Sequence, residues 1–104
     1  MAKVKVQVVE RGGEFFVVPP TVVAEKSDNL VVNNTTTVGL AFVMQGVPNG
    51  PYGSVNKIEE IAAKSKKSMP IGGGAVDGEY MFQIVMLNGK KAVGNSDPVL
   101  IIDN

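Results

Sequence analysis

Short stretches in which apolar and polar residues alternate recur along this chain, and they constrain its fold more than any other feature. Residues 3–9 alternate between valine and a polar side chain, so the valines share one face and Lys3 and Lys5 share the other. Residues 80–86 repeat the pattern with two aromatic and two aliphatic side chains. A period of two is typical of half-buried strands, and exposed lysines on a strand are one way to protect a sheet edge.

Turn-forming residues separate these stretches. Arg11-Gly12-Gly13, Pro19-Pro20, Ser27-Asp28-Asn29 and Asp77-Gly78 each follow or precede an apolar stretch. Many short strands with such turns between them predict a β-sandwich. We expect one domain over residues 1–104, with an all-β, antiparallel or Greek-key sandwich. The final stretch, Val99–Ile102, predicts a strand that is buried on both faces.

A polar run interrupts the strand pattern at Asn33–Thr37. Leu30-Val31-Val32 precedes it, and a strand with large side chains at Val38, Leu40, Phe42 and Met44 follows. The run is either a working site or a corner of a sheet, because amides and hydroxyls suit both roles. On the opposite face of the second strand, the small residues at 39 and 41 allow close packing or leave that face open.

The segment 54–67 is the helix candidate. Ser54 is a plausible N-cap. The glutamates lie near the start of the segment and the lysines near its end, which suits the dipole of a helix. Helical spacing places one set of residues on a common face: Val55, Ile58, Ile61, Ala62 and Ser65. We therefore expect a short α-helix in an insert between strands.

The order of these features resembles the cupredoxin-like family. The matching elements are Phe16-Val17-Val18-Pro19, Leu30 to Asn33, the segment 54–67, Gly78 to Gln83, and the ending Gly94 to Ile102. The resemblance covers most of the chain and implies a cupredoxin-like β-sandwich with an inserted helix. It also implies where the copper ligands of a relative would lie.

The copper ligands of the family have no counterpart here. The resemblance places a cysteine two residues after Phe82, where Ile84 stands, and a histidine shortly after Asn33, where Thr35 to Val38 stand. Ala92 lies near the expected axial position. The chain has no histidine and no cysteine, whereas a blue-copper site needs two imidazoles and a thiolate. We expect a copper-free protein without a cofactor.

Composition argues against several other functions. Ten basic and ten acidic residues give a net charge of zero, which does not favour nucleic acid as a partner. The lysines at 64, 66 and 67 are interpreted as a solvated helix end. Without histidine the usual general base at neutral pH is missing, so we expect no enzyme. Met44 and Met86 continue apolar strand faces, which favours packing over Cu(I) binding. Binding of Cu(I) by the thioethers of Met69 and Met81 remains an alternative.

The remaining candidates for contact with a ligand or partner lie in the end loops Asn33–Thr37, Val47–Gly53 and Met69–Ala75. Tyr52 belongs to no strand face, so it either stacks on a ligand or caps the core. The leading hypothesis is a non-catalytic module that acts in binding or as a structural partner. A carbohydrate- or small-ligand-binding module and a self-associating subunit are the alternatives. The candidate contact residues are Asn33, Asn34, Thr35, Asn49, Tyr52 and Asn56.

The N-terminus and the apolar runs bear on the compartment. No apolar run approaches the ~20 residues of a membrane span, and residues 1–6 lack the apolar core of a signal peptide. We expect no membrane span. The compartment stays open: periplasmic or extracellular if a signal was removed, otherwise cytoplasmic. The oligomeric state and the identity of the partner stay open as well.

Overall fold

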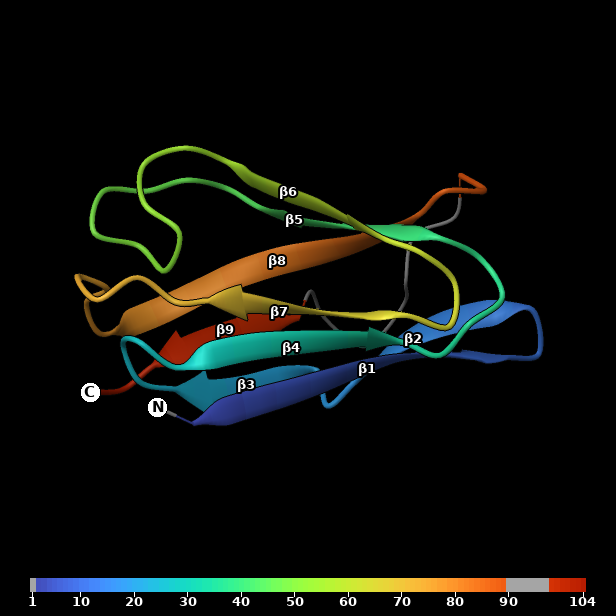
Figure 1. Cartoon of the computed structure of the whole chain (residues 1–104), viewed down its shortest axis with the longest axis horizontal. Helices are drawn as coiled ribbons and strands as arrows, with labels where there is room; N and C mark the ends of the chain where they lie inside the picture. The colour runs from blue at the N-terminus through green and yellow to red at the C-terminus, as the bar shows by residue number, and fades with distance from the viewer. Residues whose placement is uncertain (1, 90–97) are drawn as a thin grey trace.

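The chain folds into two β-sheets packed face to face, as the computed structural model shows for residues 2–89 and 98–104 (Figure 1). The first sheet contains, in spatial order, β2 (Glu14–Val18), β1 (Lys3–Arg11), β4 (Asn29–Asn34) and β7 (Lys66–Pro70). The second contains β3 (Thr21–Ala24), β9 (Val99–Ile102), β8 (Gly78–Met86), β5 (Leu40–Met44) and β6 (Lys57–Ile61). The expected all-β sandwich is confirmed.

Both sheets are mixed, whereas the sequence predicted antiparallel pairing. β1 runs parallel to β4, and β3 runs parallel to β9. The reason is the path of the chain: at Pro19-Pro20, which cannot donate to a ladder, it leaves β2 in the first sheet and enters β3 in the second. β1 therefore lies between β2 and β4. Its lysines do not protect an edge; they project from the middle of a sheet.

The predicted helix over 54–67 is wrong, and the described residues form no helix anywhere. This segment makes a turn, then β6, a second turn, and the start of β7. On the supposed helical face, Ile61 is 2% exposed but Ile58 is 63% and Val55 is 77% exposed. Residues three apart in a strand lie on opposite faces, so Ile58 points outward and Ile61 inward. Lys64 makes the corner after β6 with φ = 59°. Pairing of β6 with β5 and of β7 with β4 outweighs helical propensity.

The core lies between the sheets and follows the predicted alternation. Val6 and Val8 are fully buried, and the Phe42 and Phe82 ring centroids lie 5.0 Å apart. Such an aromatic pair contributes about 0.5–1.5 kcal/mol beyond its burial. In β9, Leu100 and Ile102 are buried while Val99 and Ile101 are half-buried, so the strand is buried fully on one face only.

Candidate functional site

The polar run after β4 is a buried corner of the sheet. Asn34 is 0% exposed, and its Nδ2 donates to the carbonyl oxygens of Val38 (2.8 Å), Ala62 (3.2 Å) and Ile61 (3.3 Å). Its Oδ1 accepts from the backbone N–H (3.0 Å) and the hydroxyl (2.7 Å) of Thr36, which is 2% exposed. One amide thus ties the start of β5 to the corner that follows β6. Asn34 holds the backbone and is not accessible to a ligand.

The neighbours of Asn34 divide between structure and surface. The Thr35 hydroxyl donates to the Val8 carbonyl (2.7 Å), and the Lys64 ammonium donates to the Thr35 carbonyl (2.7 Å). Asn33 is half-buried on the outer face of β4, opposite Lys66. Asn33 and Thr35 are both half-buried, but the Thr35 hydroxyl is bonded to the backbone, whereas Asn33 presents its side chain on the outer face of the sandwich.

The loop from 45 to 56 holds the other three predicted contact residues. Asn49 lies in a turn with φ = 60°, and its carbonyl accepts the Val76 N–H at 3.0 Å. Asn56 Oδ1 accepts the Gly46 N–H at 2.8 Å and so closes the base of this loop. Asn56 also lines an open groove of about 410 Å³ together with Val43, Gln45, Met81 and Gln83.

Tyr52 caps the core at this end. Its hydroxyl donates to the Met69 carbonyl (3.0 Å), and its ring meets Phe42 edge-on with centroids 6.2 Å apart. Burial raises the pKa of the phenol well above its usual value. The Lys57 ammonium lies 5.4 Å from the ring centroid. These contacts favour the capping alternative; contact with a ligand stays a prediction.

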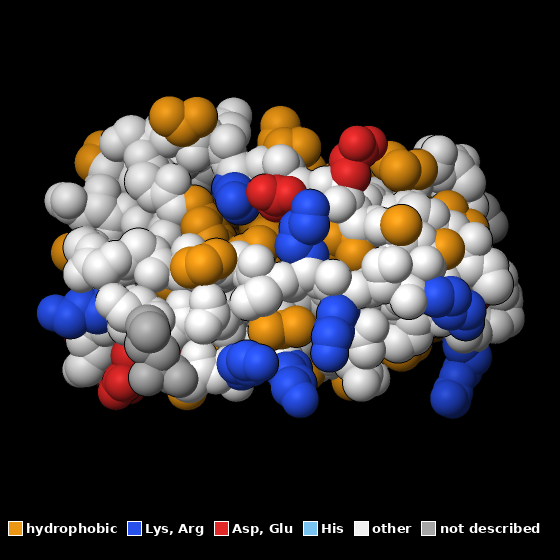
Figure 2. Space-filling view, in the orientation of Figure 1, with side chains coloured by type: hydrophobic (Ala, Val, Ile, Leu, Met, Phe, Trp, Pro, Cys, Tyr) orange, Lys and Arg blue, Asp and Glu red, His pale blue; other side chains and the backbone are white. Residues whose placement is uncertain are grey.

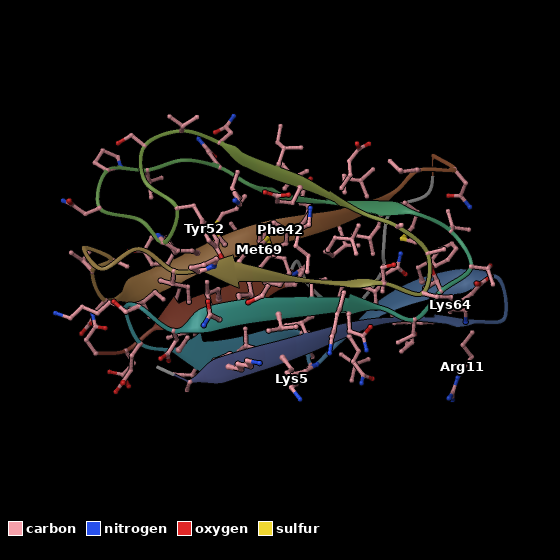
Figure 3. All side chains as sticks on the ribbon, viewed as in Figure 1. Lys5, Arg11, Phe42, Tyr52, Lys64 and Met69 are labelled. Atoms are coloured by element: carbon pink, nitrogen blue, oxygen red, sulfur yellow. The ribbon has the colours of Figure 1, made fainter. Side chains whose placement is uncertain are left out.

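The six predicted contact residues are not brought together. One group lies beside Lys64, which is labelled at the right end of Figure 3: Asn33, Asn34 and Thr35. Tyr52 is labelled toward the opposite end. Gly46, which Asn56 holds, begins the loop at that opposite end (Figure 1). The sequence grouped these residues by type, but the long axis of the sandwich separates them.

An ion-pair network bridges the two sheets between the edge strands β6 and β7. The Glu59 carboxylate lies 3.0 Å from both the Lys57 and the Lys67 ammonium, and all three project toward the inside of the sandwich, at positions that pair with buried residues. Figure 2 shows an acidic side chain between basic ones above apolar side chains at this seam. Hydrogen bonds from Lys67 and then Lys57 lower the pKa of Glu59. Such exposed pairs contribute about 0.2–1 kcal/mol each.

The outer face of the second sheet exposes several large hydrophobic side chains among the polar residues Glu60, Glu79 and Gln83, a feature not expected from the sequence. Four large hydrophobic side chains on it are more than half exposed: Val23 (57%), Ile58 (63%), Met81 (65%) and Leu87 (56%). The register places half-buried aliphatic residues between them: Ala41, Val43, Val85, Val99 and Ile101. The signal was present in the alternate positions of these strands. It was not recognised because residues 54–67 were interpreted as a helix covering an edge of the sheet.

The residues at the positions of a type 1 copper site do not fit copper. Ile84 is 1% exposed inside the core, and Thr35 and Thr36 are held by the hydrogen bonds described above. The predicted axial position, Ala92, lies outside the described residues. Within residues 2–89 and 98–104, no group of three or more His, Cys, Asp or Glu side chains converges as a metal site would require. Of the methionines, Met44, Met69 and Met86 are buried, while Met81 is exposed.

In the described part of the chain, no helix long and apolar enough to cross a membrane is found.

No protein-family model matches the sequence, and no curated protein matches it. Solved structures do match. A mutant amicyanin in its reduced Cu(I) form has a TM-score of 0.62 at 10% identity over 95% of this chain and 80% of that one. Amicyanin from Paracoccus versutus has a TM-score of 0.60 at 11% identity, over 95% and 79%. Lac15 from a marine microbial metagenome has a TM-score of 0.50 at 13% identity; this chain spans 32% of its length.

Proposed function

We propose that this chain, whose fold is cupredoxin-like, is a copper-free and non-catalytic module that binds a partner protein. The observation that carries the proposal is the apolar outer face of the second sheet. Monomeric soluble proteins rarely expose contiguous apolar patches of more than a few hundred Å², and larger patches mark interaction sites. Here Val23, Ile58 and Met81 project from three strands of one sheet, in neighbouring rows of the ladder, with half-buried aliphatic side chains between them.

The chemistry of this face suits a protein surface. Its groove combines the thioether of Met81 with the amides of Gln45, Asn56 and Gln83. Methionine adapts its shape to irregular apolar partners, and amides at the margin satisfy the polar atoms of a docked backbone. Burying apolar side chains yields about 25 cal/mol per Å² before the costs of association. The partner therefore presents an apolar patch with a polar margin.

Site-specific cross-linking tests this proposal. A photoreactive residue at position 81 or 58, in cells that make the protein, is expected to give one discrete adduct, and position 12 in the β1–β2 turn serves as the control. The identified partner is then purified, and binding is measured by calorimetry. The double variant Ile58→Ser and Met81→Ser is expected to weaken binding at least about tenfold and to keep its melting temperature, because both side chains are exposed. Equal adducts at position 12, or unchanged binding by the variant, would refute the proposal.

The copper-free part of the proposal has its own test. Titration with Cu(I) and Cu(II) in a calorimeter, with equilibrium dialysis alongside, is expected to show no stoichiometric binding. Sub-micromolar binding that Met81→Leu abolishes would contradict it, because Met81 is an exposed thioether.

Self-association is a second candidate function, and the same apolar face supports it. Two copies could bury this face against each other in a symmetric pair. Sedimentation equilibrium over a wide concentration range decides between the candidates. A dimer that Ile58→Ser and Met81→Ser dissociate would assign the face to a second copy, whereas a monomer at all concentrations leaves it to a different protein. The carbohydrate alternative is tested by a glycan array of the protein and its Tyr52→Ala variant.

A further inference from the structure

The outer face of the first sheet, opposite the apolar face, carries a cluster of lysines around an open hollow of about 310 Å³. Lys3 and Lys5 come from β1, and Lys66 comes from β7. β4 runs between these strands, and its Val31 forms the floor of the hollow at 7% exposure. Figure 2 shows basic side chains gathered over β1 and β7 in the lower half of the view, where Figure 3 labels Lys5.

None of these three ammonium groups pairs with a described carboxylate. The ion pairs that do form, within residues 2–89 and 98–104, join Glu59 to Lys57 and Lys67 at the seam. The hollow is completed by Ser68, so no acidic residue lines it. Asp28, in the turn before β4, binds the backbone and not these lysines. Its carboxylate oxygens accept hydrogen bonds from the backbone N–H groups of Glu25 and Ala2, both at 2.9 Å. A chain with zero net charge thus concentrates positive charge on one face.

The spacing of the lysines indicates the shape of the anion. Lys3 and Lys5 are alternate residues of one strand, so their Cα atoms are about 6.8 Å apart. Lys66 lies two strands away from β1, about 9.6 Å across the sheet. It pairs with Asn33, and Asn33 pairs with Gln7. Lys66 is therefore level with Gln7, two residues beyond Lys5 along the strand direction. An extended peptide repeats its side chains on one face with the same period of about 6.8 Å. Carboxylates at alternate positions of such a peptide match Lys3 and Lys5, and the long side chain of Lys66, whose Cα lies about 12 Å from that of Lys5, reaches the same peptide from the side.

We propose that this face binds an extended acidic segment of a protein, with Asp or Glu at alternate positions, across β1, β4 and β7. Lys3 and Lys5 pair with two successive carboxylates, Lys66 pairs with a further carboxylate of the same segment, and the Ser68 hydroxyl donates to the segment. The residues of the hollow favour carboxylates over nucleic acid: they include no arginine, which recognises phosphate bidentately, and no aromatic ring for base stacking.

Fluorescence anisotropy tests the proposal with two labelled peptides of equal composition. One alternates Glu and Ser, and the other places the same Glu residues in a block. The alternating peptide is expected to bind more tightly at low ionic strength, and added salt weakens its binding because exposed charges are screened. The triple variant Lys3→Gln, Lys5→Gln and Lys66→Gln is expected to raise its dissociation constant about tenfold or more, since exposed ion pairs contribute up to about fivefold each.

A charge-matched control separates the site from net charge. The triple variant Arg11→Gln, Lys26→Gln and Lys64→Gln removes the same charge outside the hollow and is expected to change the dissociation constant less than about twofold. Chemical-shift mapping is expected to place the peptide on residues 3–7, 29–33 and 66–70. Equal weakening by both triple variants, equal affinity for the block peptide, tighter binding of single-stranded oligonucleotide or heparin, or no binding at all would overturn the proposal.

Discussion

Replacing Asn34, which anchors the buried corner after β4, by Ala should strongly destabilise the protein. The two hydrogens on Nδ2 of Asn34 are shared among three acceptors, the carbonyl oxygens of Val38, Ile61 and Ala62. Its Oδ1 accepts two hydrogen bonds from Thr36. The side chain therefore makes at most about four full hydrogen bonds, each contributing roughly 1 kcal/mol net. Because Asn34 is 0% exposed, its partners are left buried without it. We expect the free energy of unfolding to fall by about 3–4 kcal/mol, out of roughly 5–15 kcal/mol for a domain of this size.

Urea unfolding followed by fluorescence or circular dichroism measures this loss, and the melting temperature should drop by roughly 15 °C or more. Asn33→Ala is the matched control: Asn33 is half-buried on the outer face and makes none of these bonds, so we expect a change within about 0.5 kcal/mol. In Asn34→Ala combined with Thr36→Val, the two losses should not add, because both remove the same hydroxyl–amide contact. An Asn34→Ala loss below about 1 kcal/mol, or no greater than that of Asn33→Ala, would refute the assignment of this amide as the corner's anchor.

Three further predictions concern stability. Tyr52→Phe removes the bond to the Met69 carbonyl and should cost about 1 kcal/mol in urea unfolding; an unchanged midpoint would argue against the cap. Hydrogen bonds from the backbone N–H groups of Glu25 and Ala2 hold the pKa of Asp28 below its usual range. The stability that the Asp28 carboxylate contributes is therefore present above about pH 4. It is lost as the pH falls through the lowered pKa of the folded state. Asp28→Asn should flatten this part of a pH titration of the urea midpoint, and an unaltered acid profile would exclude Asp28 as its source. Gly46→Ala places a Cβ 2.5 Å from the Ser54 backbone and should cost roughly 1–3 kcal/mol, whereas Gly74→Ala, with nothing within 4 Å, should be nearly neutral.

The cupredoxin-like fold could be predicted from the sequence because its evidence is local. Alternation of apolar residues in β1 and β8 specifies which face of each strand is buried, and Val6, Val8, Phe82 and Ile84 are buried as expected. The absence of histidine and cysteine is likewise a property of composition. It removes a type 1 copper site whatever the chain's conformation.

The segment 54–67 could not be predicted in this way. Its apolar residues recur at helical spacing, and only pairing with β5 and β4, which are distant in the sequence, makes this segment two strands. The sequence left the polar run open as either a working site or a corner, and it does not distinguish Asn33 from Asn34. That difference depends on which side of β4 faces the other sheet.

By itself, the sequence determined the strand faces, the sandwich and the missing copper ligands, because each depends on neighbouring residues or on residue types alone. Tertiary structure decided which strands are central and which lie at edges. β1 became an inner strand, and its lysines therefore joined Lys66 across β4 in one basic face. Residues from β3, β6 and β8 of the other sheet likewise combined into a face with exposed hydrophobic side chains. Such surfaces depend on pairing between segments distant in the chain, which no local pattern of residues specifies.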